Sequence, residues 1–209
     1  RPRPDEFQIK EAAEKIKSSK NPIIISGGGV FYSDAMEELS QFAIKHNIPV
    51  TQTVMGYSTM KRDHSHFAGQ IGGLGGKNTN TLAKETDLAI AVGTKLADFT
   101  TGSWANFENE NFKLVSINVS RFDANKHLAQ AVVGDAKVSL IELSQALGNW
   151  KAEEEWNKKS QIELKSWNEH IDKESAPTNQ EVPSYVQVIG AIYRNCLLYT
   201  SDAADDETS

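Results

Sequence analysis

Short runs of apolar residues alternate with longer amphipathic segments between residues 5 and 147. Runs such as 23–25 and 87–92 are apolar on both faces, which is typical of strands inside a parallel sheet. The longer segments repeat apolar residues every three or four positions, which is typical of helices that pack on such a sheet. We expect helices over residues 5–18, 35–45, 78–85, 123–128 and 137–147. We expect strands over residues 23–25, 48–54, 87–92, 113–118 and 131–133.

The order of strand, glycine turn, helix and strand predicts an α/β domain with a Rossmann-like parallel sheet. A helical crossover between two strands makes them parallel, and helices then cover both faces of the sheet. The helix over 35–45 is expected to begin at a cap formed by Ser33 and Asp34. We assign residues 1–149 to this one domain.

The composition changes beyond this domain. Residues 150–183 are predicted as a charged helical connector followed by a polar linker with two prolines. Trp156 and Trp167 are spaced along the connector helix. We expect them on an exposed aromatic face that needs a partner.

The last part of the chain looks incomplete. Residues 184–195 are predicted as the truncated start of a further domain, with an amphipathic helix from Tyr185 that stops near Arg194. Residues 196–209 continue no upstream pattern and resemble translated sequencing-adapter read-through, so we leave them out of the fold. The alternative is a genuine disordered tail.

Charge and composition narrow the function classes. The net charge of −6 and the pI of about 5.4 argue against nucleic-acid binding, which usually needs a basic face. No apolar run approaches the roughly 18 residues of a membrane span. The single cysteine, Cys196, cannot form an internal disulfide and fits a reducing cytoplasm. The chain opens on Arg1, without Met or a signal peptide, which suggests a fragment.

Two glycine turns follow predicted strands, where open α/β sheets bind their ligands. The amides of Gly27, Gly28 and Gly29 are placed to face a phosphate, but Tyr32 breaks the G-x-G-x-x-G pattern. A tight strand-to-helix turn is an equally good interpretation. The second turn contains Gly93 and Thr94.

Three further features each admit a structural alternative. Asp98 either binds a hydroxyl group or, as we favour, caps a helix. The glycine-rich stretch 69–76 is either a mobile loop or one that needs positive φ and close backbone approach. His64 and His66 form an H-x-H pair without further ligands at suitable spacing, so we favour a solvated loop over a metal site. No nucleophile elbow, H-E-x-x-H or P-loop motif is present.

Three stretches together resemble the central domain of thiamine-diphosphate enzymes, the group that includes acetolactate synthase and pyruvate decarboxylase. They are residues 22–30, 87–94 and 131–136, and the likeness covers residues 1–148. A narrower resemblance rests on residues 98–104 and 117–127. These two stretches are similar to the ring-opening hydrolases of myo-inositol breakdown, which convert a cyclic dione to 5-deoxyglucuronate.

The resemblance implies a three-domain parent enzyme that binds thiamine diphosphate and Mg²⁺ through its first and third domains. It also implies a small-molecule substrate and a homodimer or homotetramer. The stretch 134–136 ends in Ala136, where the metal motif of the third domain needs glycine. Glu37, Glu38 and Glu85 lie on predicted amphipathic helices and are expected to be solvated. We therefore expect a structural domain that is inactive alone.

Relatives that bind FAD in this domain show an I-D-I-D-like run where residues 117–120 read Ile-Asn-Val-Ser. FAD or ADP binding is therefore not expected, because no carboxylate is present to accept from ribose hydroxyls. The candidate cofactor-binding residues are Gly27, Gly28, Gly29, Gly93, Thr94 and Asn118. The alternatives are an acetolactate synthase-like central domain, a stand-alone nucleotide-binding module and a purely structural docking domain.

Overall fold

The computed structural model describes the backbone of residues 1–205 and the side chains of residues 1–195. The chain divides into two compact units, Arg1–Leu164 and a second that begins at Lys165. The first unit extends beyond the 149 residues assigned from the sequence, because the first part of the connector helix packs on the sheet. That helix, α8, spans Glu154–Glu174 and crosses the boundary between the units.

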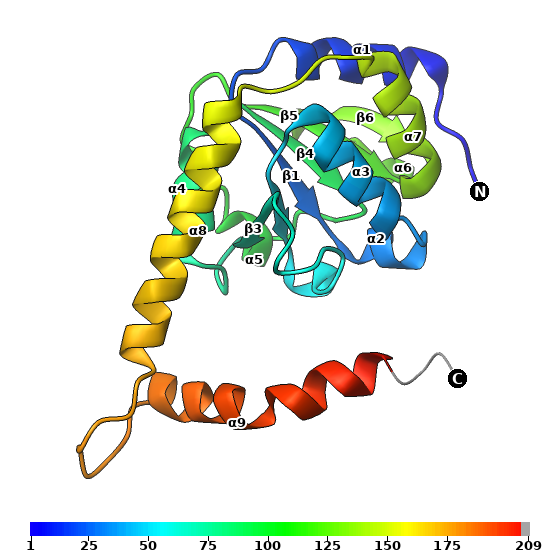
Figure 1. Ribbon diagram of the computed structural model, residues 1–209. Coiled ribbons are helices and arrows are strands. Elements are labelled where there is room, and N and C mark those ends of the chain that lie inside the picture. Colours follow the sequence, from blue (N-terminus) through cyan, green and yellow to red (C-terminus); the bar gives the residue numbers. More distant parts are fainter. Residues whose placement is uncertain (206–209) are drawn as a thin grey trace. The chain divides into compact units, whose positions relative to one another are not determined.

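The first unit is built on a six-stranded sheet in which all paired strands are parallel (Figure 1). The strand order β3-β2-β1-β4-β5-β6 is that of the Rossmann fold, whose topological switch point lies between the first and fourth strands. This confirms the predicted α/β class. The strands are β1 (Pro22–Ser26), β2 (Val50–Gln52), β3 (Phe67–Gln70), β4 (Leu88–Val92), β5 (Lys113–Asn118) and β6 (Gln130–Val133).

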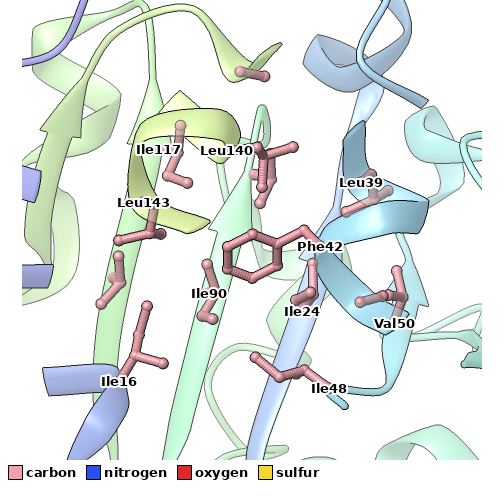
Figure 2. Close-up of a cluster of buried hydrophobic side chains, with 14 of the residues drawn as sticks. Ile16, Ile24, Leu39, Phe42, Ile48, Val50, Ile90, Ile117, Leu140 and Leu143 are labelled. Atoms are coloured by element: carbon pink, nitrogen blue, oxygen red, sulfur yellow. The ribbon is translucent and has the colours of Figure 1, made fainter. Parts of the chain in front are cut away.

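Three helices cover one face of the sheet: α1 (Glu6–Lys17), α3 (Met36–His46) and α7 (Ala136–Leu147). Figure 2 shows the ring of Phe42 lying against the isoleucine side chains of the central strands, with Leu140 and Leu143 of α7 beside it. All of these side chains are buried in one cluster. β4 presents Leu88, Ile90 and Val92 to this face, so its larger apolar side chains are buried here.

The other face is covered by α4 (Lys77–Glu85), by the first part of α8 and by the aromatic loop after α5 (Asp98–Thr101). β4 presents only Ala89 and Ala91 to it, so the covering elements can approach closely. Trp156 of α8 is buried there, and its Nε1–H donates to the carbonyl oxygen of Pro22 at 2.8 Å. The expectation that Trp156 is exposed for docking is therefore wrong, because its partner is the sheet of its own chain.

Capping explains where two of the helices begin. Asp5 and Asp135 each accept backbone N–H bonds at the start of α1 and α7. The cap expected for α3 is absent, since its N-cap is Ala35 and no side chain bonds there. Asp34 instead has a left-handed backbone (φ 46°) and its carboxylate lies 3.4 Å from Nζ of Lys137.

The sequence pattern predicted the bounds of some helices and strands poorly. β3 was not predicted, because residues 67–70 are short and contain a glycine; pairing with β2 makes them a strand. The strand expected over 48–54 is shorter, since residues Val54–Gly56 form the 3₁₀ turn η1. The helix expected over 123–128 is two short pieces, α6 (Arg121–Ala124) and η2 (Lys126–Leu128). A further short helix, α2 (Gly28–Tyr32), follows β1.

The second unit contains the end of α8, a polar linker and α9 (Tyr185–Asp205). Arg194 Nη2 donates to the carbonyl oxygen of Ser175 at 2.9 Å, which ties α9 to the end of α8. The helix was expected to stop near Arg194 but continues, because the next eleven residues contain no glycine or proline. The predicted foreign tail at 196–209 falls outside the described side chains.

None of the helices in the described part of the chain is both long enough and apolar enough to cross a membrane.

We predict that Phe42→Ala lowers the free energy of unfolding by about 3–5 kcal/mol, because it leaves a cavity between α3 and the sheet. Phe7→Ala is the matched control, since the Phe7 side chain is exposed on α1. Urea unfolding followed by circular dichroism measures both variants. A Phe42→Ala chain as stable as the control would contradict the assigned core.

Candidate functional site at the carboxyl edge of the sheet

The structure brings the six predicted site residues together at one edge of the sheet. Gly27, Gly28 and Gly29 follow β1, Gly93 and Thr94 follow β4, and Asn118 ends β5. In a parallel sheet the carboxyl ends of all strands share an edge, so these turns are neighbours. They flank the switch point, the position where such sheets bind ligands.

The glycine turns contact each other through their backbones. The Gly27 amide donates to the carbonyl oxygen of Val92 and the Gly29 amide to that of Gly93, both at 2.9 Å. A Cβ atom at Gly29 would lie 2.6 Å from Cα of Gly93, which is itself left-handed at φ 62°. The glycines therefore allow two backbones to touch, and two of the three amides considered for phosphate are already bonded.

The polar groups of Asn118 are also used inside the domain. Its Nδ2 donates to the carbonyl oxygen of Thr94 at 3.1 Å, and its Oδ1 accepts from the amide of Ser120 at 2.9 Å. This side chain fastens the turn after β4 to the turn after β5. Each end of the amide can take one further hydrogen bond beside these two. A role of the six residues in ligand binding stays a prediction, and this geometry favours a structural role.

The glycine-rich stretch 69–76 is held by close backbone approach. This was the second interpretation given from the sequence, and the first was a mobile loop. Gly72 has φ 106°, and the amide of Gly73 donates to the carbonyl oxygen of Phe99 at 2.7 Å. Asn80 of α4 bonds both backbone groups of Gly72, at 3.1 and 3.0 Å. No sequence signal pointed to Asn80, whose partner is a backbone that only the fold brings near.

The two stretches behind the narrower resemblance meet in space. The rings of Trp104 and His127 lie 4.4 Å apart between centroids. Both residues have left-handed backbones, at φ 70° and φ 60°, which is unfavourable for side chains of this size. Such conformations persist only where surrounding contacts hold them, so the neighbouring residues fix the backbone of this pair.

The loop histidines, His64 and His66, were expected to be solvated, but the structure buries His66 and half-buries His64. His66 is buried, its Nε2–H donates to Oδ1 of Asn47 at 3.1 Å, and its Nδ1 accepts from Ser65 Oγ at 3.0 Å. His64 accepts the His66 amide and bonds Ser40 Oγ at 2.9 Å. Burial, and secondarily the nearby His64, lower the pKa of His66 to about 4. These contacts belong to a neutral pair that fastens the loop to α3.

Asp98 and the glutamates also differ from expectation. Asp98 is the first residue of α5, whose N-cap is Ala97, so it does not cap the helix. Glu38 is half-buried and pairs with Lys137 at 3.1 Å, and Glu85 pairs with Lys159. Glu38 and Glu85 are therefore ion-paired rather than simply solvated.

Side chains that bind metal ions are dispersed in the described part of the chain. Among them, no three His, Cys, Asp or Glu side chains gather in a group able to hold a metal ion. Asp135 is committed to capping α7, with its Oδ1 3.1 Å from the Lys137 amide and its Oδ2 3.0 Å from Arg1 Nη1. The carboxylate in the Gly134-Asp135-Ala136 stretch thus has a structural role.

Comparison with protein families agrees with this geometry. The model of the thiamine pyrophosphate enzyme central domain matches residues 9–143, more than half of the chain. The chain belongs to the thiamine pyrophosphate enzyme family. The matched range runs from α1 to α7, so the central-domain match covers all six strands.

Three curated members of this family illustrate the similarity. The chain is 45% identical over 140 residues to 3D-(3,5/4)-trihydroxycyclohexane-1,2-dione hydrolase 1 of Bacillus cereus, and the match covers 67% of this chain. It is 44% identical over 140 residues to the proteins named 3D-(3,5/4)-trihydroxycyclohexane-1,2-dione hydrolase in Bacillus anthracis and Bacillus thuringiensis, with the same coverage. In each case the match spans only 22% of the relative's length.

We predict that Gly29→Ala destabilises the domain by about 1–3 kcal/mol, because its methyl group would overlap the Gly93 backbone. Gly73→Ala is the control, since a Cβ there meets only Phe99 atoms at 3.7 Å, an ordinary contact. Thermal and urea unfolding measure both. Equal stability of the two variants would contradict the close packing of the turns.

We predict that the free energy of unfolding falls as pH drops from about 6.5 to about 4, because the unfolded chain binds a proton that folded His66 resists. His66→Gln removes this contribution, on the order of 2–3 kcal/mol at pH 4 relative to pH 7. His170→Gln, on the exposed surface of α8, is the control. Urea titrations across this pH range check it, and identical pH profiles for both variants would refute the assignment.

Proposed function

We propose that this chain is the central domain of a thiamine-diphosphate-dependent hydrolase. The enzyme opens the ring of 3D-trihydroxycyclohexane-1,2-dione to give 5-deoxyglucuronate in inositol catabolism. The observation that carries the proposal is the 45% identity to a hydrolase of that name. The contact between Trp104 and His127 supports it, because it joins the two stretches on which the resemblance to these hydrolases rests.

Within that enzyme the domain has a structural role. Its carboxyl edge is closed by backbone contacts, and the described residues provide no metal group. Thiamine diphosphate and Mg²⁺ are then held by parts of the parent polypeptide outside residues 1–195. The proposed division is 1–149 for the central domain, 150–183 for the connector and 184–195 for the start of the cofactor-binding domain.

The proposed setting follows from the same resemblance. The parent enzyme acts in the cytoplasm on a small molecule, as a homodimer or homotetramer, and binds no nucleic acid. The net charge of −6 and the single cysteine support this setting.

The test is to sequence the source DNA across both ends of the reading frame and to express the full-length parent polypeptide. We expect ring opening of the dione that depends on thiamine diphosphate and Mg²⁺, and no turnover by the 209-residue chain. Condensation of pyruvate to acetolactate by the parent would instead assign it to the acetolactate synthase group and overturn the proposal.

The stand-alone nucleotide-binding alternative has its own measurement. We predict that titration calorimetry of the 209-residue chain with FAD, ADP and NAD detects no binding tighter than about 1 mM, because residues 117–120 contain no carboxylate to accept from a ribose hydroxyl and the Gly27 and Gly29 amides are already bonded. Binding of any of the three in the micromolar range, lost in Asn118→Ala, would favour a nucleotide-binding module.

A further inference from the structure

β3 is the last strand at one edge of the six-stranded sheet, next to β2. An uncovered edge strand can pair with a strand of another chain, and natural proteins commonly cover such edges. Here the covering element is the segment 154–164, the yellow first part of α8 in Figure 1. This segment belongs to the same compact unit as the sheet. We call it the edge helix.

Two amide side chains of the edge helix bond backbone carbonyl oxygens at this edge. Asn157 Nδ2 donates to the carbonyl oxygen of Ser65 at 3.4 Å, and Gln161 Nε2 donates to that of Phe67 at 3.0 Å. The residue between them, His66, has its carbonyl oxygen on the Val50 amide of β2 at 2.7 Å. The edge helix therefore bonds the carbonyl groups that β2 does not use.

A third side chain extends this series with an apolar contact. A Cβ at Gly69 would lie 3.7 Å from Cδ1 of Leu164, so the leucine packs over the next alternate residue of the edge. The three contacting residues of the helix are four and then three positions apart, which places them on one helix face. The backbone residues opposite them follow in steps of two. The helix thus runs along the edge in register with it, in the place where a further strand would add.

The start of the edge helix is fixed independently. Asn47 Nδ2 donates to the carbonyl oxygens of Ala152 and Glu153, both at 3.2 Å, just before the helix begins. Trp156 is buried against the sheet and bonds the carbonyl oxygen of Pro22. These contacts hold the helix beside the sheet, and the three edge contacts hold its length against β3.

The rest of the β3 edge is covered by α4. Asn78 Nδ2 donates to the carbonyl oxygen of Ala68 at 2.8 Å, and Thr79 Oγ1 bonds that of Gln70. The opposite edge of the sheet, β6, has a similar cover, since Gln8 Oε1 of α1 accepts the Val133 amide at 2.9 Å. Side chains from helices therefore take the place of neighbouring strands at both edges.

We propose that the edge helix prevents β3 from pairing with β3 of a second copy of this chain. Two identical strands related by a two-fold axis form an antiparallel pair in which each donates and accepts equally, so an uncovered edge is complementary to itself. The edge helix competes successfully because it belongs to the same chain and its effective concentration is high. When it is displaced, the same edge becomes an interaction surface for a second copy.

The test compares two triple variants of the 209-residue chain. The edge variant removes the three contacts with the β3 edge: Asn157→Ala, Gln161→Ala and Leu164→Ser. The control makes the same kinds of change at exposed positions of the same helix and leaves the net charge unaltered: Glu155→Ala, Lys158→Ala and Ile162→Ser. Hydrogen exchange with mass spectrometry and sedimentation velocity are measured over a series of chain concentrations.

In the edge variant at low concentration we expect residues 67–70 and 154–164 to exchange about tenfold faster than in wild type. At high concentration we expect a species of twice the wild-type mass, with residues 67–70 protected again. The control should match wild type in both measurements.

Three results would overturn the proposal. The first is an edge variant that exchanges faster but keeps the wild-type mass at every concentration. The second is a dimer in which residues 67–70 stay unprotected, because the contact would then lie elsewhere. The third is unchanged exchange over residues 154–164, because the three contacts would then not hold the helix.

Single variants of Gln161 decide the question if circular dichroism shows that the edge variant is unfolded. Glutamate has a similar size but its carboxylate cannot donate to the Phe67 carbonyl oxygen, whereas the lysine ammonium group can. We expect Gln161→Glu to self-associate with rising concentration and Gln161→Lys to match wild type. Equal behaviour of the two would contradict the proposal.

Discussion

The carboxyl edge of this sheet depends on one backbone contact, the hydrogen bond of 2.9 Å from the Gly29 amide to the Gly93 carbonyl oxygen. It joins the turns after β1 and β4 at the switch point of the Rossmann topology. Only glycine allows the approach, since a Cβ at Gly29 would lie 2.6 Å from Cα of Gly93. At the switch point, where open α/β sheets usually bind a ligand, these two turns are thus in direct backbone contact.

The other features of the edge follow from this closure. With the turns in contact, Asn118 reaches the Thr94 carbonyl oxygen, and the Gly27 and Gly29 amides bond backbone carbonyl oxygens. The side chains left in solvent are large and apolar, such as Met55 and Phe122. Close packing at the two glycines therefore accords with the structural role proposed for this domain.

The pattern of apolar and polar residues predicted best the elements that are determined by their own residues. The strand over 113–118 was located to the residue, and the Rossmann class followed from alternating strands and helices. β3 was missed because its four residues become a strand only by pairing with β2. The predicted cap of α3 was wrong because Asp34 turns away to Lys137, a residue about a hundred positions later in the chain.

The same limit applies to the candidate site. Its six residues lie at one edge in the structure, because carboxyl ends of parallel strands always meet there. What their polar groups bond was not predictable, since the partners of Gly29 and Asn118 follow other strands.

Amide hydrogen exchange of the glycine turn, followed by NMR on the 209-residue chain, tests the closed edge most directly. We expect strong protection of the Gly27 and Gly29 amides, comparable to that of β4, because each bonds a backbone carbonyl. Gly28, the first helical residue of α2, should exchange fast, since amides at a helix start precede the first helical bond. Fast exchange at all three glycines would contradict a closed edge and leave the amides available to a ligand.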